Sequence, residues 1–100
     1  MSKCRVLIVD DIAENIAQMV DMLSNLDIEI KKAYGGKEAI ELVETFKPNI
    51  ILLDLMMPEV NGWDVIEHVR ARYDKNEMII IITSLLNNKD NIDECYEMGV

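Results

Sequence analysis

The sequence is poor in the residue types that build zinc sites. It contains one histidine, His68, and two cysteines, Cys4 and Cys95, which lie far apart and form no CxxC pair. A structural zinc cluster needs more such ligands at close spacing, so the composition excludes one. We predict that both cysteines are reduced and that His68 is a solvated helix residue rather than a catalytic base.

Positive charge is also scarce. The chain has 10 Lys and Arg residues against 19 Asp and Glu residues, a formal net charge of −9 at pH 7. Nucleic acids and anionic lipids attract clusters of Lys and Arg, so we expect this domain to bind neither nucleic acid nor a membrane. Apolar runs are too short to span a bilayer, and the aspartates after Val9 interrupt any signal-peptide core. We expect a cytoplasmic protein.

What the sequence does contain is a regular alternation of strand-like and helix-like segments. Three continuous apolar runs predict strands that are buried on both faces of a parallel sheet: residues 6–9, 50–53 and 78–82. A more exposed strand is predicted near residues 28–34. Apolar residues at helical spacing predict helices at residues 12–25, 37–46, 63–73 and 87–98. This order predicts one α/β domain with helices on both faces of the sheet.

Each of the three apolar runs ends abruptly in polar residues. Asp10 and Asp11 follow the first run, Asp54 the second, and Thr83 the third. A single aspartate at a strand end is commonly a helix cap or a turn residue. In open α/β sheets, however, ligands bind beyond the carboxyl ends of the strands, so these residues together predict one shared pocket.

Three clustered carboxylates repel one another unless a cation neutralises them. Oxygen ligands without nearby histidine or cysteine favour Mg²⁺, with Mn²⁺ as an alternative. The sequence has no Ser-His-Asp arrangement and no glycine-rich nucleotide loop after the first strand. A carboxylate beside a divalent cation can itself be the nucleophile, and it then forms an aspartyl phosphate.

These residues resemble the receiver domains of two-component response regulators. The likeness rests on the motifs VLIVDD, PNIILLDLMMPEVNGWDVI and IIIITS, and it extends from Arg5 to Val100. The resemblance implies a flavodoxin-like, doubly wound parallel sheet with strand order 2-1-3-4-5. It also implies a phosphorelay function, in which a histidine kinase or histidine phosphotransfer protein phosphorylates the domain and an output partner senses the change.

The resemblance also assigns roles to individual residues. Asp54 matches the phosphoacceptor, Asp11 the direct Mg²⁺ ligand, and Asp10 its neighbour that acts through water. Met56 matches the residue whose backbone carbonyl binds the metal, and Thr83 the switch hydroxyl. The implied domain is not an enzyme with a separate substrate, because its chemistry is limited to its own phosphorylation and dephosphorylation.

One departure from the family pattern concerns the end of the sequence. The family continues with a fifth strand that ends in a lysine, an aromatic switch residue and a fifth helix, and Lys89 does not match that lysine. We therefore expect residues 1–100 to form a C-terminally incomplete receiver domain. Its phosphorylation should be impaired, and its exposed fourth strand should allow self-association.

Two alternatives remain open at this point. A phosphorylation-independent interaction module would keep the fold and bind Mg²⁺ without taking up a phosphoryl group. A metal-dependent phosphohydrolase would require a second acid two residues after the nucleophile, and that position is occupied by Met56.

Overall fold

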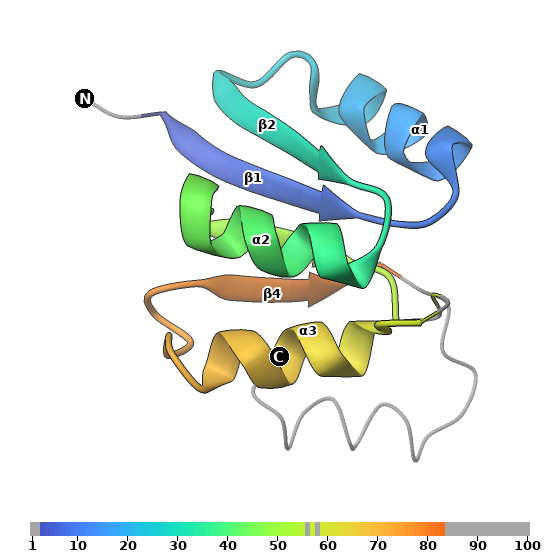
Figure 1. Ribbon diagram of the computed structural model, residues 1–100. Helices are drawn as coiled ribbons and strands as arrows, with labels where there is room; N and C mark the ends of the chain where they lie inside the picture. Colours follow the sequence, from blue (N-terminus) through green and yellow to red (C-terminus); the bar gives the residue numbers. More distant parts are fainter. Residues whose placement is uncertain (1–2, 56, 58, 84–100) are drawn as a thin grey trace.

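Four parallel strands alternate along the chain with three helices (Figure 1). The computed structural model describes residues 3–55, 57 and 59–83, and the structural statements below concern those residues. The strands are β1 (Cys4–Val9), β2 (Ile28–Ala33), β3 (Ile50–Leu53) and β4 (Ile79–Ile82), and the helices are α1 (Ala13–Leu23), α2 (Gly36–Phe46) and α3 (Gly62–Arg70). The predicted α/β alternation is confirmed through β4.

The sheet has the order β2-β1-β3-β4. Val9 pairs with both Ala33 and Leu53, and Leu53 pairs with Ile82, so the four strands end together at one edge. The chain passes from β1 outward to β2 and then crosses to β3 on the other side of β1. This reversal leaves the carboxyl ends of β1 and β3 adjacent, which is where open α/β sheets bind their ligands.

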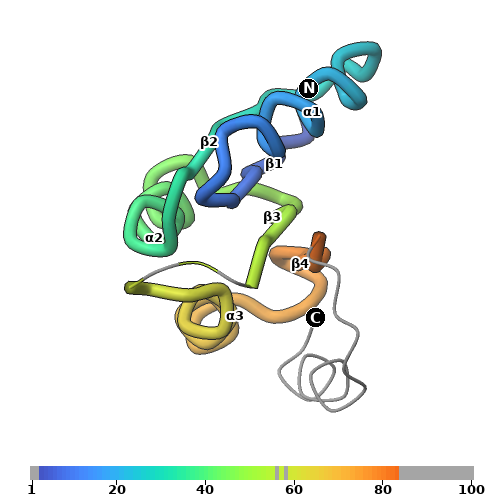
Figure 2. The backbone as a smooth tube through the Cα atoms, turned by 90° about the vertical axis from the view of Figure 1, so that its right-hand side faces the viewer, coloured from blue at the N-terminus to red at the C-terminus, as the bar shows by residue number. Residues whose placement is uncertain are grey.

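Alternate residues of the strands face two separate apolar cores. Figure 2 shows α1 on one side of the sheet and α2 with α3 on the other. Leu7 and Val9 of β1 belong to the core beneath α2 and α3, whereas Val6 and Ile8 pack with Ile16 of α1. The side-chain period of two residues in a strand produces this division.

The start of α3 follows from a reciprocal pair of hydrogen bonds. The backbone N–H of Asp64 donates to the side-chain oxygen of Asn61 at 3.1 Å, and the N–H of Asn61 donates to the carboxylate of Asp64 at 3.2 Å. This capping box satisfies two N–H groups at the helix start. Val65, Ile66 and Val69 then form the buried stripe of the helix.

Two details of the sequence-based prediction are wrong. Helix α3 ends at Arg70 instead of residue 73, and the chain there turns toward β4. The guanidinium group of Arg70 donates to the carbonyl oxygens of Tyr73 and Met78, at 3.4 and 2.7 Å, and this stabilises the turn. The helix predicted at residues 87–98 lies outside the described residues.

The second wrong detail is the burial of β4. Ile80 is 3% exposed, but Ile79 and Ile81 are 46% and 47% exposed. Register places these two isoleucines on the face that carries α1, because Ile79 pairs with Ile50, which in turn pairs with Val6. The core beneath α1 includes residues of β1, β2 and β3 but none of β4, so the β4 end of that face is left open. None of the described helices is long and apolar enough to cross a bilayer.

Candidate metal centre

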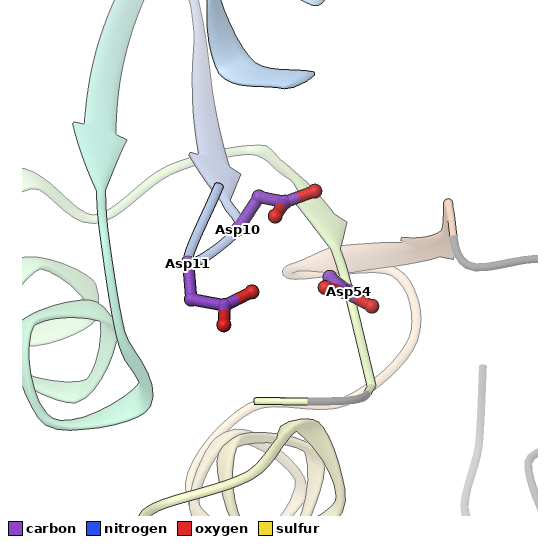
Figure 3. A group of neighbouring side chains, drawn as sticks. All are labelled: Asp10, Asp11 and Asp54. Carbon is purple, nitrogen blue, oxygen red and sulfur yellow. The ribbon is translucent and has the colours of Figure 1, made fainter. Parts of the chain in front are cut away.

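Three carboxylates meet at the carboxyl edge of the sheet. Asp10 and Asp11 follow β1 and Asp54 follows β3, and one carboxylate oxygen of each lies within 4.8 Å of the others. Figure 3 shows the three side chains around a common space at the tips of the two strands. In the part of the chain described, this is the one group of three or more His, Cys, Asp or Glu residues close enough to hold a metal ion.

The backbone of the sheet fixes these residues in place. The N–H of Asp10 donates to the carbonyl oxygen of Ala33 at 3.1 Å, and the N–H of Asp54 donates to that of Val9 at 3.0 Å. Each aspartate therefore continues the hydrogen-bond ladder by one rung beyond its strand. The structure therefore brings the carboxyl ends of β1 and β3 together, as the sequence predicted.

Thr83 occupies the equivalent position after β4. Its N–H donates to the carbonyl oxygen of Leu53 at 2.9 Å, so it lies beside Asp54 in the same row. The residue is exposed. Met56 lies outside the described residues, so its role as a carbonyl ligand stays a prediction.

Asp10 is the most enclosed of the three acids, with 4% of the residue exposed. One carboxylate oxygen accepts the N–H of Ile12 at 2.8 Å, and the other accepts the side-chain amide of Asn15 at 3.2 Å. Burial raises the pKa of Asp10 above its ordinary value, the two hydrogen bonds oppose that shift, and the charges of Asp54 and Asp11 add to it.

The other two acids are more accessible. Asp11 is exposed and Asp54 is half-buried. Three mutually close carboxylates with oxygen-only donors are the ligand type that Mg²⁺ prefers, and the cation would relieve their repulsion. The donor set therefore fits a hard divalent cation.

The loop after Asp54 is held close to the site by a glycine. A side chain at Gly62 would lie 2.5 Å from the Cα atom of Leu55 and 2.6 Å from the carbonyl oxygen of Asp54. The N–H of Gly62 also donates to the carbonyl oxygen of Leu55 at 3.1 Å. Only glycine allows the start of α3 to approach the acceptor strand so closely.

Sequence analysis did not identify Asn15. Its contact with Asp10 depends on the angle at which α1 leaves β1, which no pattern in the sequence encodes. The one available signal was a side-chain amide in the first helical turn after a strand-end acid.

A family model described as the response regulator receiver domain matches residues 6–100. The chain belongs to this family. Receiver domains of two-component systems typically bind Mg²⁺ and become phosphorylated, and they interact with histidine kinases and output domains.

Curated relatives of this receiver domain include proteins with different outputs. The chemotaxis protein CheY of Thermotoga maritima is 37% identical over 82 residues, which cover 81% of this chain and 68% of that protein. A probable cyclic di-GMP phosphodiesterase of Vibrio cholerae is 32% identical over 99% of this chain, and the DNA-binding transcriptional activator EvgA of Escherichia coli K12 is 37% identical over 93%. The receiver domain spans only 22% and 45% of these last two proteins.

Solved receiver structures have the same fold. The signal receiver domain of a putative Luxo repressor protein from Vibrio parahaemolyticus superposes with a TM-score of 0.90 at 24% identity, over 100% of this chain and 75% of that one. A CheX–CheY–BeF3–Mg²⁺ complex from Borrelia burgdorferi gives a TM-score of 0.85 at 26% identity, over 95% and 72%. The predicted strand order is confirmed for the four described strands.

Proposed function

We propose that this receiver domain is the phosphoacceptor of a two-component phosphorelay. Asp54 takes a phosphoryl group from a histidine kinase or a histidine phosphotransfer protein, and the added charge alters a protein-interaction surface. The observation that supports this most strongly is the cluster of Asp10, Asp11 and Asp54 at the end of β1 and β3, with carboxylate oxygens within 4.8 Å of one another.

In the proposed reaction, a carboxylate oxygen of Asp54 attacks the phosphorus atom of a phosphohistidine. The bond between phosphorus and the imidazole nitrogen breaks, and its electron pair stays on the nitrogen, which then takes up a proton. The product is a mixed anhydride on Asp54. The domain supplies the acceptor in this reaction and does not turn over a separate substrate, so we propose that it is not an enzyme in the usual sense.

We propose that Asp10, Asp11 and Asp54 hold Mg²⁺, with Mn²⁺ as a substitute. The bound cation would offset the negative charge of the carboxylates and of the incoming phosphoryl oxygens. Asp11 is exposed at the edge of the cluster and suits direct coordination. Both oxygens of Asp10 already accept hydrogen bonds, so its remaining lone pairs suit contact through water. The Borrelia complex, which contains BeF3 and Mg²⁺, supports the choice of Mg²⁺ as the cation.

Thr83 is proposed to be the residue that senses the phosphoryl group. It lies next to Asp54 in the row of backbone hydrogen bonds and is exposed, so its hydroxyl is free to rotate toward the acceptor. A hydrogen bond from this hydroxyl to a phosphoryl oxygen would connect the chemistry on β3 to the end of β4. We also propose that the carbonyl oxygen of Met56 completes the metal ligands.

The test is intact-mass spectrometry after incubation with Mg²⁺ and acetyl phosphate. We expect one phosphoryl adduct on the parent chain, and none on Asp54→Asn or after chelation of the metal. Asp21→Asn is the matched control, because it removes an exposed carboxylate from α1 and should still allow the adduct.

Two results would contradict the proposal. An adduct on Asp54→Asn as abundant as on the parent would place the acceptor elsewhere. Because residues 1–100 are expected to be phosphorylated poorly, a parent without an adduct is compared with a version extended by the fifth strand and helix of the family. Absence of the adduct from that version too, although it binds Mg²⁺, would favour the phosphorylation-independent interaction module.

A further inference from the structure

Asn15 lies in the first turn of α1 and contacts the metal site without belonging to it. Its side-chain Nδ2 donates to one carboxylate oxygen of Asp10 at 3.2 Å. An ionised carboxylate only accepts hydrogen bonds, so the amide must present its NH₂ group here. The second oxygen of Asp10 accepts the N–H of Ile12 at 2.8 Å.

Together these two donors fix the plane of the Asp10 carboxylate. The contact from Ile12 is a local turn in which an aspartate accepts an N–H two residues later. That contact alone leaves the carboxylate free to tilt about the hydrogen bond. The amide of Asn15 holds the opposite oxygen, so a rotation of the carboxylate about its last bond would lengthen both hydrogen bonds.

The orientation of Asp10 matters because of what surrounds it. The residue is 4% exposed, and one of its oxygens lies within 4.8 Å of oxygens of Asp11 and Asp54. The lone pairs of Asp10 that accept no hydrogen bond therefore face this shared space only when the carboxylate plane is held within a narrow range of angles. Helix propensity does not account for asparagine at position 15, because asparagine is an indifferent helix former.

We propose that Asn15 is a positioning residue for the metal site, and that it holds the Asp10 carboxylate with its free lone pairs toward the space shared with Asp11 and Asp54. This inference rests on the proposed function, since it assumes that a divalent cation occupies that space. Asn15 supplies this orientation as a neutral donor, without adding to the charge of the cluster.

The test measures the Mg²⁺ dissociation constant by calorimetric titration of the parent, Asn15→Ala and Asn15→Leu. Leucine keeps a side chain of similar size and favours the helix, so it separates the loss of the hydrogen bond from the loss of packing. Gln18→Ala is the matched control, because it removes an exposed amide one turn further along α1. Thermal unfolding without metal reports any purely structural effect.

We expect both Asn15 variants to bind Mg²⁺ about tenfold more weakly, the lower end of the loss that is typical when an outer hydrogen-bond partner of a metal site is removed. Their metal-free melting temperatures should match that of Gln18→Ala. The same comparison in an Asp10→Ala background should show no further loss from Asn15→Ala, because the effect of Asn15 passes through Asp10.

Each contrary outcome has a distinct meaning. Unchanged Mg²⁺ affinity in both Asn15 variants would overturn the positioning role and leave the proposed function intact. An equal loss with and without Asp10 would also overturn it, since Asn15 would then act by another route. A parent chain that binds no Mg²⁺ would overturn the metal site of the proposed function, and this inference with it.

Discussion

The side-chain oxygen of Asn49 accepts the backbone N–H of Arg5 at 2.8 Å, across 44 residues of sequence. The N–H of Asn49 returns a hydrogen bond to the carbonyl oxygen of Arg5 at 2.8 Å, and the carbonyl oxygen of Asn49 accepts the N–H of Ile79 at 2.9 Å. The Arg5 side chain in turn donates to the carbonyl oxygens of Phe46 and Lys47 at the end of α2. These contacts join β1, β4 and α2 at the sheet edge opposite the carboxylates.

Replacement of Asn49 should therefore destabilise the fold without affecting the metal site. Asn49→Ala removes the acceptor for the N–H of Arg5 and leaves that partly buried group unsatisfied. We expect the free energy of unfolding to fall by about 1–3 kcal/mol in urea titrations. Asn25→Ala, in the exposed turn after α1, should change it by less than about 0.5 kcal/mol. A large loss of Mg²⁺ affinity in Asn49→Ala would contradict the expectation that contacts at this end of the sheet do not influence the metal site at the other end.

Two adjacent glycines at the start of α2 should respond very differently to alanine. A side chain at Gly36 would collide with the carbonyl oxygen of Val60, whereas one at Gly35 would have nothing within 4 Å. Gly36→Ala should cost about 1–3 kcal/mol of unfolding free energy, because backbone must move to admit the methyl group. Gly35→Ala, where the backbone is extended, should be neutral or slightly stabilising. Equal effects of the two substitutions in urea unfolding would refute the close contact.

Tyr73 should titrate at a higher pH than an ordinary tyrosine. Burial raises its pKa above 10.0, and Glu44 raises it further through its charge and a 3.4 Å hydrogen bond from the phenol. The folded protein therefore keeps the phenol proton to higher pH than the unfolded chain does. The stability linked to this proton is complete below pH 10 and is lost as the pH rises through the raised pKa.

Substitution of Glu44 tests this assignment. Glu44→Gln removes the negative charge, so the pKa of Tyr73 should move down toward its ordinary value, as followed by NMR of ring-labelled tyrosine. Glu41→Gln, an exposed acid on the same helix, is the control and should leave the Tyr73 pKa unchanged. The prediction fails if the Glu44 variant titrates like the parent.

The open face of β4 should promote self-association. Ile79 and Ile81 expose 46% and 47% of their surface, and β4 is the outermost strand of the described sheet beside β3. Exposed apolar edge strands pair readily with other chains. We expect light scattering to detect association of the parent at high concentration and a marked reduction in Ile81→Lys. Met22→Lys introduces the same charge at a residue of α1 that is 72% exposed, and it should have little effect. A monomeric parent at all concentrations would contradict this.

The strand ends and the acid site were predictable because both follow from local rules. Continuous apolar runs such as Ile50–Leu53 identify strands covered on both faces, and parallel strands bring their carboxyl ends together. The aspartates at these ends, Asp10 and Asp54, were therefore predictable as neighbours before any coordinates. Only the distances between their carboxylate oxygens required the structure.

Contacts between distant residues were not predictable in the same way. The capping of α2 by Arg5 depends on the crossing of α2 over β1, and the contact of Asn15 with Asp10 depends on the direction of α1. The prediction that β4 is buried on both faces was wrong because an apolar run shows only that both faces of a strand are able to be covered. Which face is covered depends on the position of α1 over the sheet.

The row of backbone hydrogen bonds described above limits how this edge can respond to chemistry. The N–H groups of Asp10, Asp54 and Thr83 each close the last rung of the ladder to a neighbouring strand, at 2.9–3.1 Å. Peptide groups held in this way exchange their protons slowly and move little, whereas an exposed side chain such as that of Thr83 rotates within nanoseconds. A rearrangement at this edge therefore begins with torsions of the exposed side chains, while the hydrogen-bonded backbone beneath them stays in place.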